Sequence, residues 1–273
     1  MTNGDVRAEV AYVNDEWRDS EEPPRIYSGE SRRANTSYRT VDIADARQAY
    51  QDRSLSLDRE GFQLVNHASS FTQFDDRDQV LSTYFAEMEA LLLEVTGATA
   101  AFPFPFYQVR SADPEHFFDA YSLYMHCDYS LSSCIPFAQS IIRRARRQES
   151  YPPEAWDFAF FNLWRAVDAP VERDPLVWIA ADSLDLTDVI DYRPVRDAAE
   201  GLAALPLFNE QQRLYYFPNL EPHEVLVLKQ LDSRDHVAQV CPHTSFVDPN
   251  SRADARPRRS IDVRFLCMFP KGD

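Results

Sequence analysis

Short apolar runs separated by turn-forming residues recur along most of the chain, and they limit its fold more than any other feature. Many of these runs are rich in β-branched or aromatic residues and are bounded by Pro, Asp or Asn, as strands are. We predict strands at residues 61–67, 107–110, 121–128, 158–167, 177–180, 214–217, 225–231, 237–241 and 260–269. So many short strands with few helices favour a barrel or a jelly roll. The 18 Phe and 13 Tyr residues fit sheets with aromatic interiors.

Two helices are expected beside these strands. Residues 75–95 carry apolar side chains at helical spacing and acids near the start, and Gly97 follows as a C-cap signal. Residues 136–148 form the second helix, with the basic run 143–147 on its solvated face. The sequence therefore predicts a mainly β fold with flanking helices.

The first part of the chain differs in character from the rest. Residues 1–56 are polar and charged with short apolar islands, and we expect them to wrap the core as an extended arm. Residues 57–273 would form the β core with helical additions. No linker rich in Gly, Ser or Pro divides residues 1–273, so the sequence predicts a single domain.

The overall charge excludes several classes of partner. A formal net charge of −16 repels phosphate backbones and anionic lipid surfaces. We therefore expect no nucleic acid and no membrane partner. A small-molecule substrate fits this composition, and a homo-oligomer is left open.

Cysteine usage and the N-terminal sequence predict a cytoplasmic protein. The four cysteines are widely spaced and form neither a C-x-x-C pair nor a dense disulfide framework, so we expect reduced thiols. They are Cys127, Cys134, Cys241 and Cys267. The N-terminus has no basic region followed by an apolar one, and no stretch of about 18 apolar residues occurs.

The run around His126 and Asp128 is the first candidate metal site. Side chains two residues apart on a strand point to the same face, so this imidazole and this carboxylate can take adjacent positions on one metal ion. They would be two of the three ligands in the two-histidine, one-carboxylate triad of non-haem iron sites. His243 begins a distant segment that can return beside them. Taken alone, each pattern also fits ordinary strand residues.

A basic residue in a suitable place strengthens the metal hypothesis. Arg258 follows His243 by fifteen positions and begins a strand, with Ser260 on the same strand face. A guanidinium with a hydroxyl can hold the C5 carboxylate of a co-substrate such as 2-oxoglutarate, because a bidentate charged pair fixes charge and direction. Arg264 projects the same way further along and is the rival for this role.

These motifs together resemble the iron(II)/2-oxoglutarate oxygenase superfamily, with its H-x-D, distant H and R-x-S order. More narrowly, the chain is similar to the hydroxylase/desaturase group of secondary metabolism that includes a cephamycin 7-hydroxylation component. The similarity runs from about Val41 to Phe269. It is carried by SLDREGFQLVNH (56–67), TGA (96–98), HCD (126–128), NLWR (162–165), DPLVWIAADS (174–183), KQLDS (229–233), HTSF (243–246) and RRSIDVR (258–264).

The resemblance implies a double-stranded β-helix, the jelly roll also found in cupins. It implies iron(II) on His126, Asp128 and His243, 2-oxoglutarate on Arg258 with Ser260, and O2 as the second co-substrate. The enzyme would hydroxylate or desaturate a small secondary metabolite through hydrogen abstraction by a ferryl species, and cyclisation by the same route stays open. Because Asp128 is present, no iron position is freed for chloride, which disfavours halogenation.

Three further residues are candidates for contact with the substrate. Asn162 and Arg165 lie on opposite faces of a predicted strand, and one of these faces would line the pocket. Arg165 could pair with a carboxylate, whereas Tyr124 shares the predicted metal-ligand face and would form a pocket wall. Two other functions compete with the oxygenase: a non-redox jelly-roll protein that binds a metal such as zinc, and an inactive supporting subunit of a biosynthetic enzyme.

Overall fold

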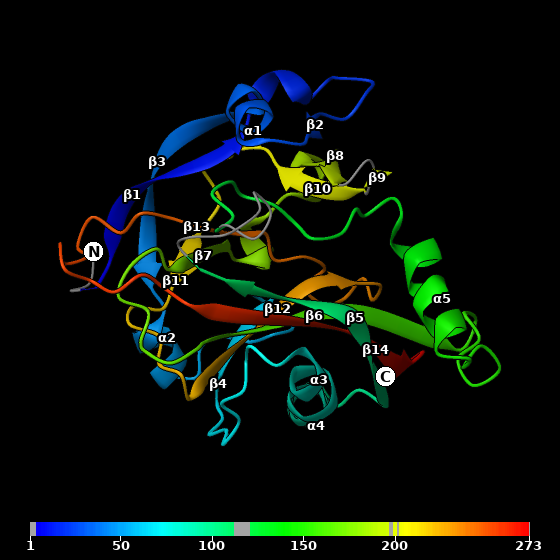
Figure 1. Ribbon diagram of the computed structural model, residues 1–273. Coiled ribbons are helices and arrows are strands. Elements are labelled where there is room, and N and C mark those ends of the chain that lie inside the picture. Colours follow the sequence, from blue (N-terminus) through cyan, green and yellow to red (C-terminus); the bar gives the residue numbers. More distant parts are fainter. Residues whose placement is uncertain (1–3, 112–120, 197–198, 201, 273) are drawn as a thin grey trace.

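The computed structural model describes residues 4–111, 121–196, 199–200 and 202–272, and within this part of the chain two five-stranded sheets form the body of the molecule (Figure 1). In the first sheet the order is β1 (Val6–Val13), β3 (Thr36–Asp45), β11 (Leu214–Tyr216), β7 (Leu176–Ile179) and β13 (His243–Ser245). In the second it is β4 (Phe62–Asn66), β12 (Glu224–Asp232), β6 (Trp156–Ala166), β14 (Ser260–Pro270) and β5 (Ala100–Arg110).

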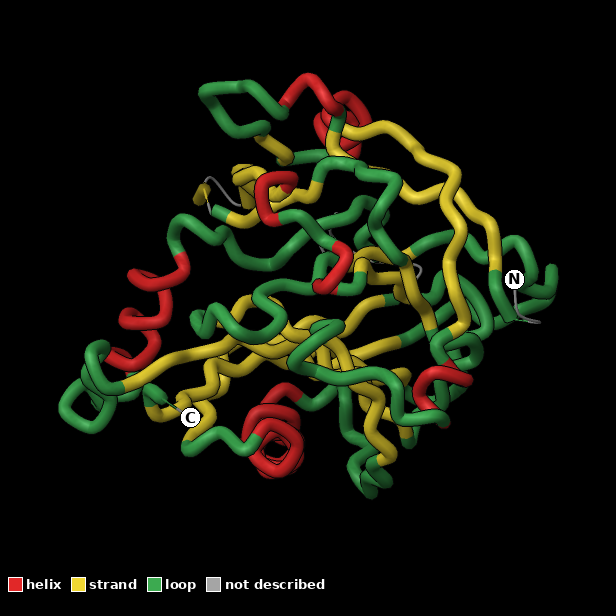
Figure 2. Tube along the Cα trace, turned by 180° about the vertical axis from the view of Figure 1, so that it is seen from behind, coloured by secondary structure: helices red, strands yellow, loops and turns green. Residues whose placement is uncertain are grey.

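A smaller, separate sheet lies next to β1 of the first one. It contains β10 (Ala203–Pro206), β8 (Val189–Arg196) and β2 (Arg25–Ile26), and β9 (Ala199–Glu200) pairs with β8. Seen from behind in Figure 2, β1 and β3 curve along one side of the molecule, the long strands of the second sheet cross its lower half, and the longer helices lie at its edge.

The space between the two large sheets is filled by aromatic and aliphatic side chains. Phe62 of β4 lies 4.9 Å from Trp178 of β7, measured between ring centroids, and Trp178 lies 5.4 Å from Phe217. All three side chains are almost fully buried. Burying rings of this size is worth roughly 2–3 kcal/mol each, so these contacts hold the two sheets together.

One long helical segment covers the outer face of the second sheet. It consists of α3 (Arg77–Gln79), a π-helical turn η2 (Val80–Tyr84) and α4 (Phe85–Thr96), and Figure 1 shows it beneath the sheet. Phe85 of α4 packs 5.7 Å from Phe265 of β14. The predicted helix 75–95 is therefore confirmed, with a π turn that the apolar spacing did not reveal.

The remaining helices lie at the ends of the sheets. Among the described residues they are α1 (Gly29–Asn35), α2 (Arg47–Gln51) and α5 (Cys134–Arg144), with short 3-10 turns at Asp15–Trp17, Ala181–Ser183 and Leu186–Asp188. Helix α5 corresponds to the predicted helix 136–148 and ends four residues earlier.

Most predicted strands are found, and two predictions are wrong. Residues 121–128 do not form a strand, because their backbone groups bond to three different strands: Met125 to Ala11, His126 to His243, and Cys127 to Ala204. Residues 237–241 likewise bond to scattered partners and form no strand. The apolar islands within residues 1–56 lie in β1 and β3, which pair along eight residues.

Gly97 ends α4 in the left-handed conformation, with φ +68° and its N–H bonded to the Leu93 carbonyl at 3.0 Å. A Cβ at this position would meet no atom within 4 Å, so only the backbone angle disfavours a side chain. We expect Gly97→Ala to lower the free energy of unfolding by about 1 kcal/mol, and Gly97→Asn by less. Urea denaturation measures both, and equal stability of Gly97→Ala and the wild type would contradict this expectation.

Candidate metal centre

Two histidines and one carboxylate from distant parts of the chain meet between the two large sheets. Ligand atoms of His126, Asp128 and His243 all lie within 4.8 Å of one another. The backbones of His126 and His243 exchange two hydrogen bonds, of 3.1 and 2.9 Å, which bring the imidazole centroids to 4.7 Å. Nε2 of His126 lies 3.8 Å from Oδ1 of Asp128. The structure thus brings together all three predicted metal ligands.

Both imidazoles are buried and uncharged at neutral pH. Burial lowers the pKa of His126 below its usual value and lowers that of His243 to about 3. Nδ1 of His126 lies 3.0 Å from the Tyr124 carbonyl oxygen and therefore carries the proton in that hydrogen bond, which leaves Nε2 with a free lone pair. A neutral imidazole oriented through its other nitrogen is the form that binds metal ions.

The carboxylate of Asp128 is held from both sides. Nη2 of Arg264 lies 3.1 Å from Oδ1, and Nδ2 of Asn162 donates to Oδ2. Although burial alone would raise the pKa of Asp128, the Arg264 guanidinium and the two histidines hold it well below its usual range. Arg264 and Asn162 are direct partners across β14 and β6, so both side chains reach the same carboxylate.

A β-bulge brings a further polar group to the centre. The register between β12 and β6 shifts between Lys229 and Leu231, which leaves Gln230 as the extra residue. Its fully buried amide lies 3.3 Å from Nδ1 of His243 and accepts a hydrogen bond from the Asp128 N–H. Bulges beside functional sites commonly re-aim a side chain in this way. We did not predict Gln230, although a polar pair inside the apolar run 225–231 was a visible signal.

The cavity beside the imidazoles extends to a second group of polar atoms. Among its lining residues are His126, His243, Asn162, Trp164, Arg258 and Arg264. Arg258 and Ser260 are buried, and within the described chain Nε of Arg258 and Oγ of Ser260 have no hydrogen-bond partner. Nη1 of Arg258 donates to Oγ of Ser245 at 3.0 Å and to the Asp174 carbonyl.

The two candidate arginines have different surroundings. Arg264 bonds to two carboxylates, those of Asp128 and Asp262, each at 3.1 Å. In the part of the chain that the structure describes, Arg258 donates to a hydroxyl and a backbone carbonyl and to no carboxylate, and its guanidinium lies over the Tyr121 ring at 4.2 Å. A buried guanidinium N–H just before β14 and the buried hydroxyl of the first residue of β14, both without partners in the described chain, fit a ligand carboxylate.

The candidate substrate residues lie in three different surroundings. Asn162 lines the cavity, but its amide nitrogen is used by Asp128. Tyr124 packs behind His126 with ring centroids 5.2 Å apart, and its hydroxyl pairs with that of Tyr192.

Arg165 does not reach the cavity, so the prediction of a pocket role for it is wrong. Its guanidinium donates to the carbonyl oxygens of Pro222 and His67 and lies over the Tyr84 ring, on the helix-covered side of the sheet. The physical reason is the alternation of β6, which sends Asn162 to one face and Arg165 to the other.

Comparisons with known proteins agree with this geometry. The family model described as "Oxidoreductase/YMDC permease-like domain" matches residues 10–268. The Fe(II)/2-oxoglutarate-dependent dioxygenase nvfI of Aspergillus novofumigatus is 30% identical over 83% of this chain and 82% of its own. The chain belongs to the iron(II)/2-oxoglutarate-dependent dioxygenases.

Other relatives of this dioxygenase carry similar names. The hydroxylase/desaturase efuI of Hormonema carpetanum is 27% identical over 79% of each chain. A solved structure of the iron and alpha-ketoglutarate-dependent endoperoxidase NvfI, described as having a different conformation, superposes with a TM-score of 0.84 at 26% identity, covering 98% of both chains.

These similarities confirm the predicted jelly-roll fold and the predicted enzyme class, whose cofactor is iron(II) and whose co-substrate is 2-oxoglutarate. They favour the dioxygenase over the non-redox jelly-roll protein and the inactive subunit. No helix in the described ranges is long and apolar enough to span a membrane.

The contact between Asn162 and Asp128 predicts a measurable effect on metal binding. We expect Asn162→Leu to weaken Co(II) and Fe(II) binding by roughly 10- to 100-fold, because the carboxylate loses the donor that fixes its orientation. Equilibrium dialysis measures the affinity. The same change at the exposed end of β4, Asn66→Leu, is the matched control. Equal metal affinity of both variants and the wild type would show that Asn162 does not position the carboxylate.

Proposed function

We propose that His126, Asp128 and His243 bind the iron(II) of this dioxygenase, and that Arg258 with Ser260 binds the C5 carboxylate of 2-oxoglutarate. One observation carries the proposal: two neutral imidazoles, with an ionised carboxylate beside them, line a cavity together with a buried guanidinium whose Nε has no partner in the described chain. This is the donor set that ferrous iron takes in two-histidine, one-carboxylate sites.

The residues of the chain fit the chemistry of the family. Bound iron(II) and 2-oxoglutarate supply the activation of O2. The protein keeps both imidazoles deprotonated and the carboxylate ionised, and it fixes their directions through Tyr124, Asn162 and Arg264. Arg258 sets how far the co-substrate extends from the metal. Trp164, Leu176 and Leu228 line the cavity and limit the access of water to the reacting atoms.

We propose hydroxylation or desaturation of a small secondary metabolite as the reaction, with cyclisation as a second outcome. The names of the relatives support both: several are hydroxylase/desaturases, and the solved relative is an endoperoxidase. Asp128 fills the third protein position on the metal, which disfavours halogenation. We further propose that the enzyme acts in the cytoplasm, since its four cysteines are free thiols.

The metal assignment is tested by the visible charge-transfer band that forms when iron(II) and 2-oxoglutarate bind together. We expect this band in the wild type under anaerobic conditions and its loss in Asp128→Ala. Asp235→Ala, which removes a carboxylate that is 98% exposed, is the control and should keep the band. Absence of the band in folded wild-type protein would refute the proposed iron site.

The co-substrate assignment distinguishes Arg258 from its rivals. We expect Arg258→Gln to weaken 2-oxoglutarate binding by at least about 2 kcal/mol, roughly 30-fold, because a buried carboxylate would lose its charged partner. Arg259→Gln removes a neighbouring guanidinium that pairs with Asp75 and Asp168 at the surface, and should change the affinity little. Titration of the charge-transfer band measures both. A larger loss in Arg264→Gln, with metal affinity intact, would move the anchor to Arg264.

A further inference from the structure

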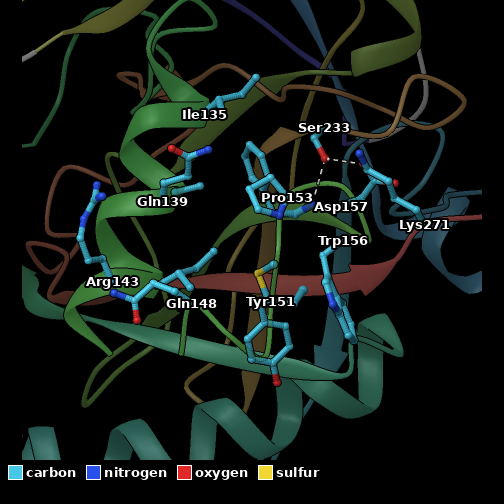
Figure 3. A pocket seen from close by; sticks show the side chains of 14 residues that line it. Ile135, Gln139, Arg143, Gln148, Tyr151, Pro153, Trp156, Asp157, Ser233 and Lys271 are labelled. Carbon is cyan, nitrogen blue, oxygen red and sulfur yellow. Dashed lines mark hydrogen bonds between the residues drawn. The ribbon is translucent and has the colours of Figure 1, made fainter. Parts of the chain in front are cut away.

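A second cavity, of about 440 Å³, lies beside helix α5, at the ends of β6 and β14 (Figure 3). Its volume is within the range of small-molecule sites. Its residues come from α5, from the segment that follows it, and from the strand ends, and it shares no lining residue with the cavity at the metal centre.

Aromatic packing separates the two cavities. Arg264 contacts Asp128, whereas Met268, four residues later on β14, lines the α5 cavity, which places the two roughly 13 Å apart along the strand. Side chains of the intervening cluster include Tyr129 and Phe160, stacked at 4.5 Å. A ligand in the α5 cavity would therefore not touch the metal.

The floor of the α5 cavity is apolar. Ala138 and Ile142 of α5 face Trp156, Phe158 and Met268 across it. Tyr151 closes one side, with its ring 4.8 Å from that of Trp156 in an edge-to-face contact. Such walls favour rings or aliphatic chains.

The edge of the cavity carries more positive than negative charge. Arg143 and Lys271 stand on opposite sides of it in Figure 3, and neither has an ion pair with any part of the chain that the structure describes. The carboxylate of Asp157 accepts a hydrogen bond from Oγ of Ser233 at 3.1 Å. Two cations without ionic partners at an apolar cavity are unusual on a protein with a net charge of −16.

We propose that the α5 cavity is a binding site for an amphipathic organic anion. Its ring or chain lies against Trp156 and Met268, and its carboxylate or sulfonate lies at the cavity edge beside Arg143, with Lys271 on the other side adding to the positive charge. The site is independent of the metal centre and of the assignments made there.

The probe is 8-anilinonaphthalene-1-sulfonate, an aromatic anion whose fluorescence rises in apolar surroundings. We expect saturable binding of one probe per folded full-length chain. Arg143→Glu should weaken it about fivefold, because a cation at the cavity edge is replaced by an anion. Arg144→Glu makes the same change of charge at the neighbouring exposed position, which does not line the cavity, and should leave the affinity within twofold.

Two further measurements locate the probe. Gln139→Trp fills the cavity from the half-buried face of α5 and should abolish binding of this anion and of its neutral analogue N-phenyl-1-naphthylamine. Arg143→Glu should weaken only the anion. With iron(II) and 2-oxoglutarate present, the probe should leave the charge-transfer band unchanged. Equal effects of Arg143→Glu and Arg144→Glu, full binding to Gln139→Trp, or displacement of 2-oxoglutarate by the probe would each overturn the proposal.

Discussion

The buried carboxylate of Asp128 is the constraint on which the arrangement of the strands around it depends. An ionised group removed from water between two sheets is stable only when charges and hydrogen-bond donors surround it. Arg264 of β14 and Asn162 of β6 contact the carboxylate directly, and His126 and His243 lie beside it. The Gln230 amide, from the bulge in β12, accepts a hydrogen bond from the Asp128 backbone N–H. Three neighbouring strands thus hold Asp128 in place, so the register of the second sheet and the shape of the centre are set together.

The sequence predicted the type of most helices and strands because burial of one face makes apolar residues recur at the spacing of that element. The prediction was wrong where a segment has this spacing but does not pair continuously with one neighbouring strand. Residues 121–128 alternate as a strand does, yet their backbone groups bond to β1, β13 and β10 in turn. Which partners a backbone finds depends on contacts distant in the sequence, and β13 itself is only three residues long. The π turn in the helix and the bulge at Gln230 are local irregularities, and the regular spacing of apolar residues gives no sign of either.

The candidate site was predictable to the extent that chemistry restricts the residue types. A histidine and a carboxylate two residues apart, a later histidine, and an arginine followed by a hydroxyl have few alternative uses in combination. The face of a strand was harder to assign. Both faces of β6 are buried over its last eight residues, one against the other sheet and one against the helix. The sequence of apolar and polar residues therefore does not show that Asn162 faces the metal centre and Arg165 faces the helix.

One face of β14 changes character along its length, and this divides the interior into two halves. The side chains of Ser260, Asp262 and Arg264 are polar, and the last two line the cavity at the metal centre, whereas Leu266 and Met268 continue the same face as apolar packing. A charged co-substrate is favoured in the first half, where a guanidinium and a hydroxyl offset its desolvation. Apolar groups are favoured in the second half, where Met268 lines the α5 cavity. The two halves of β14 therefore face different surroundings: the first faces the polar metal centre, and the second faces a region suited to a larger and more hydrophobic molecule.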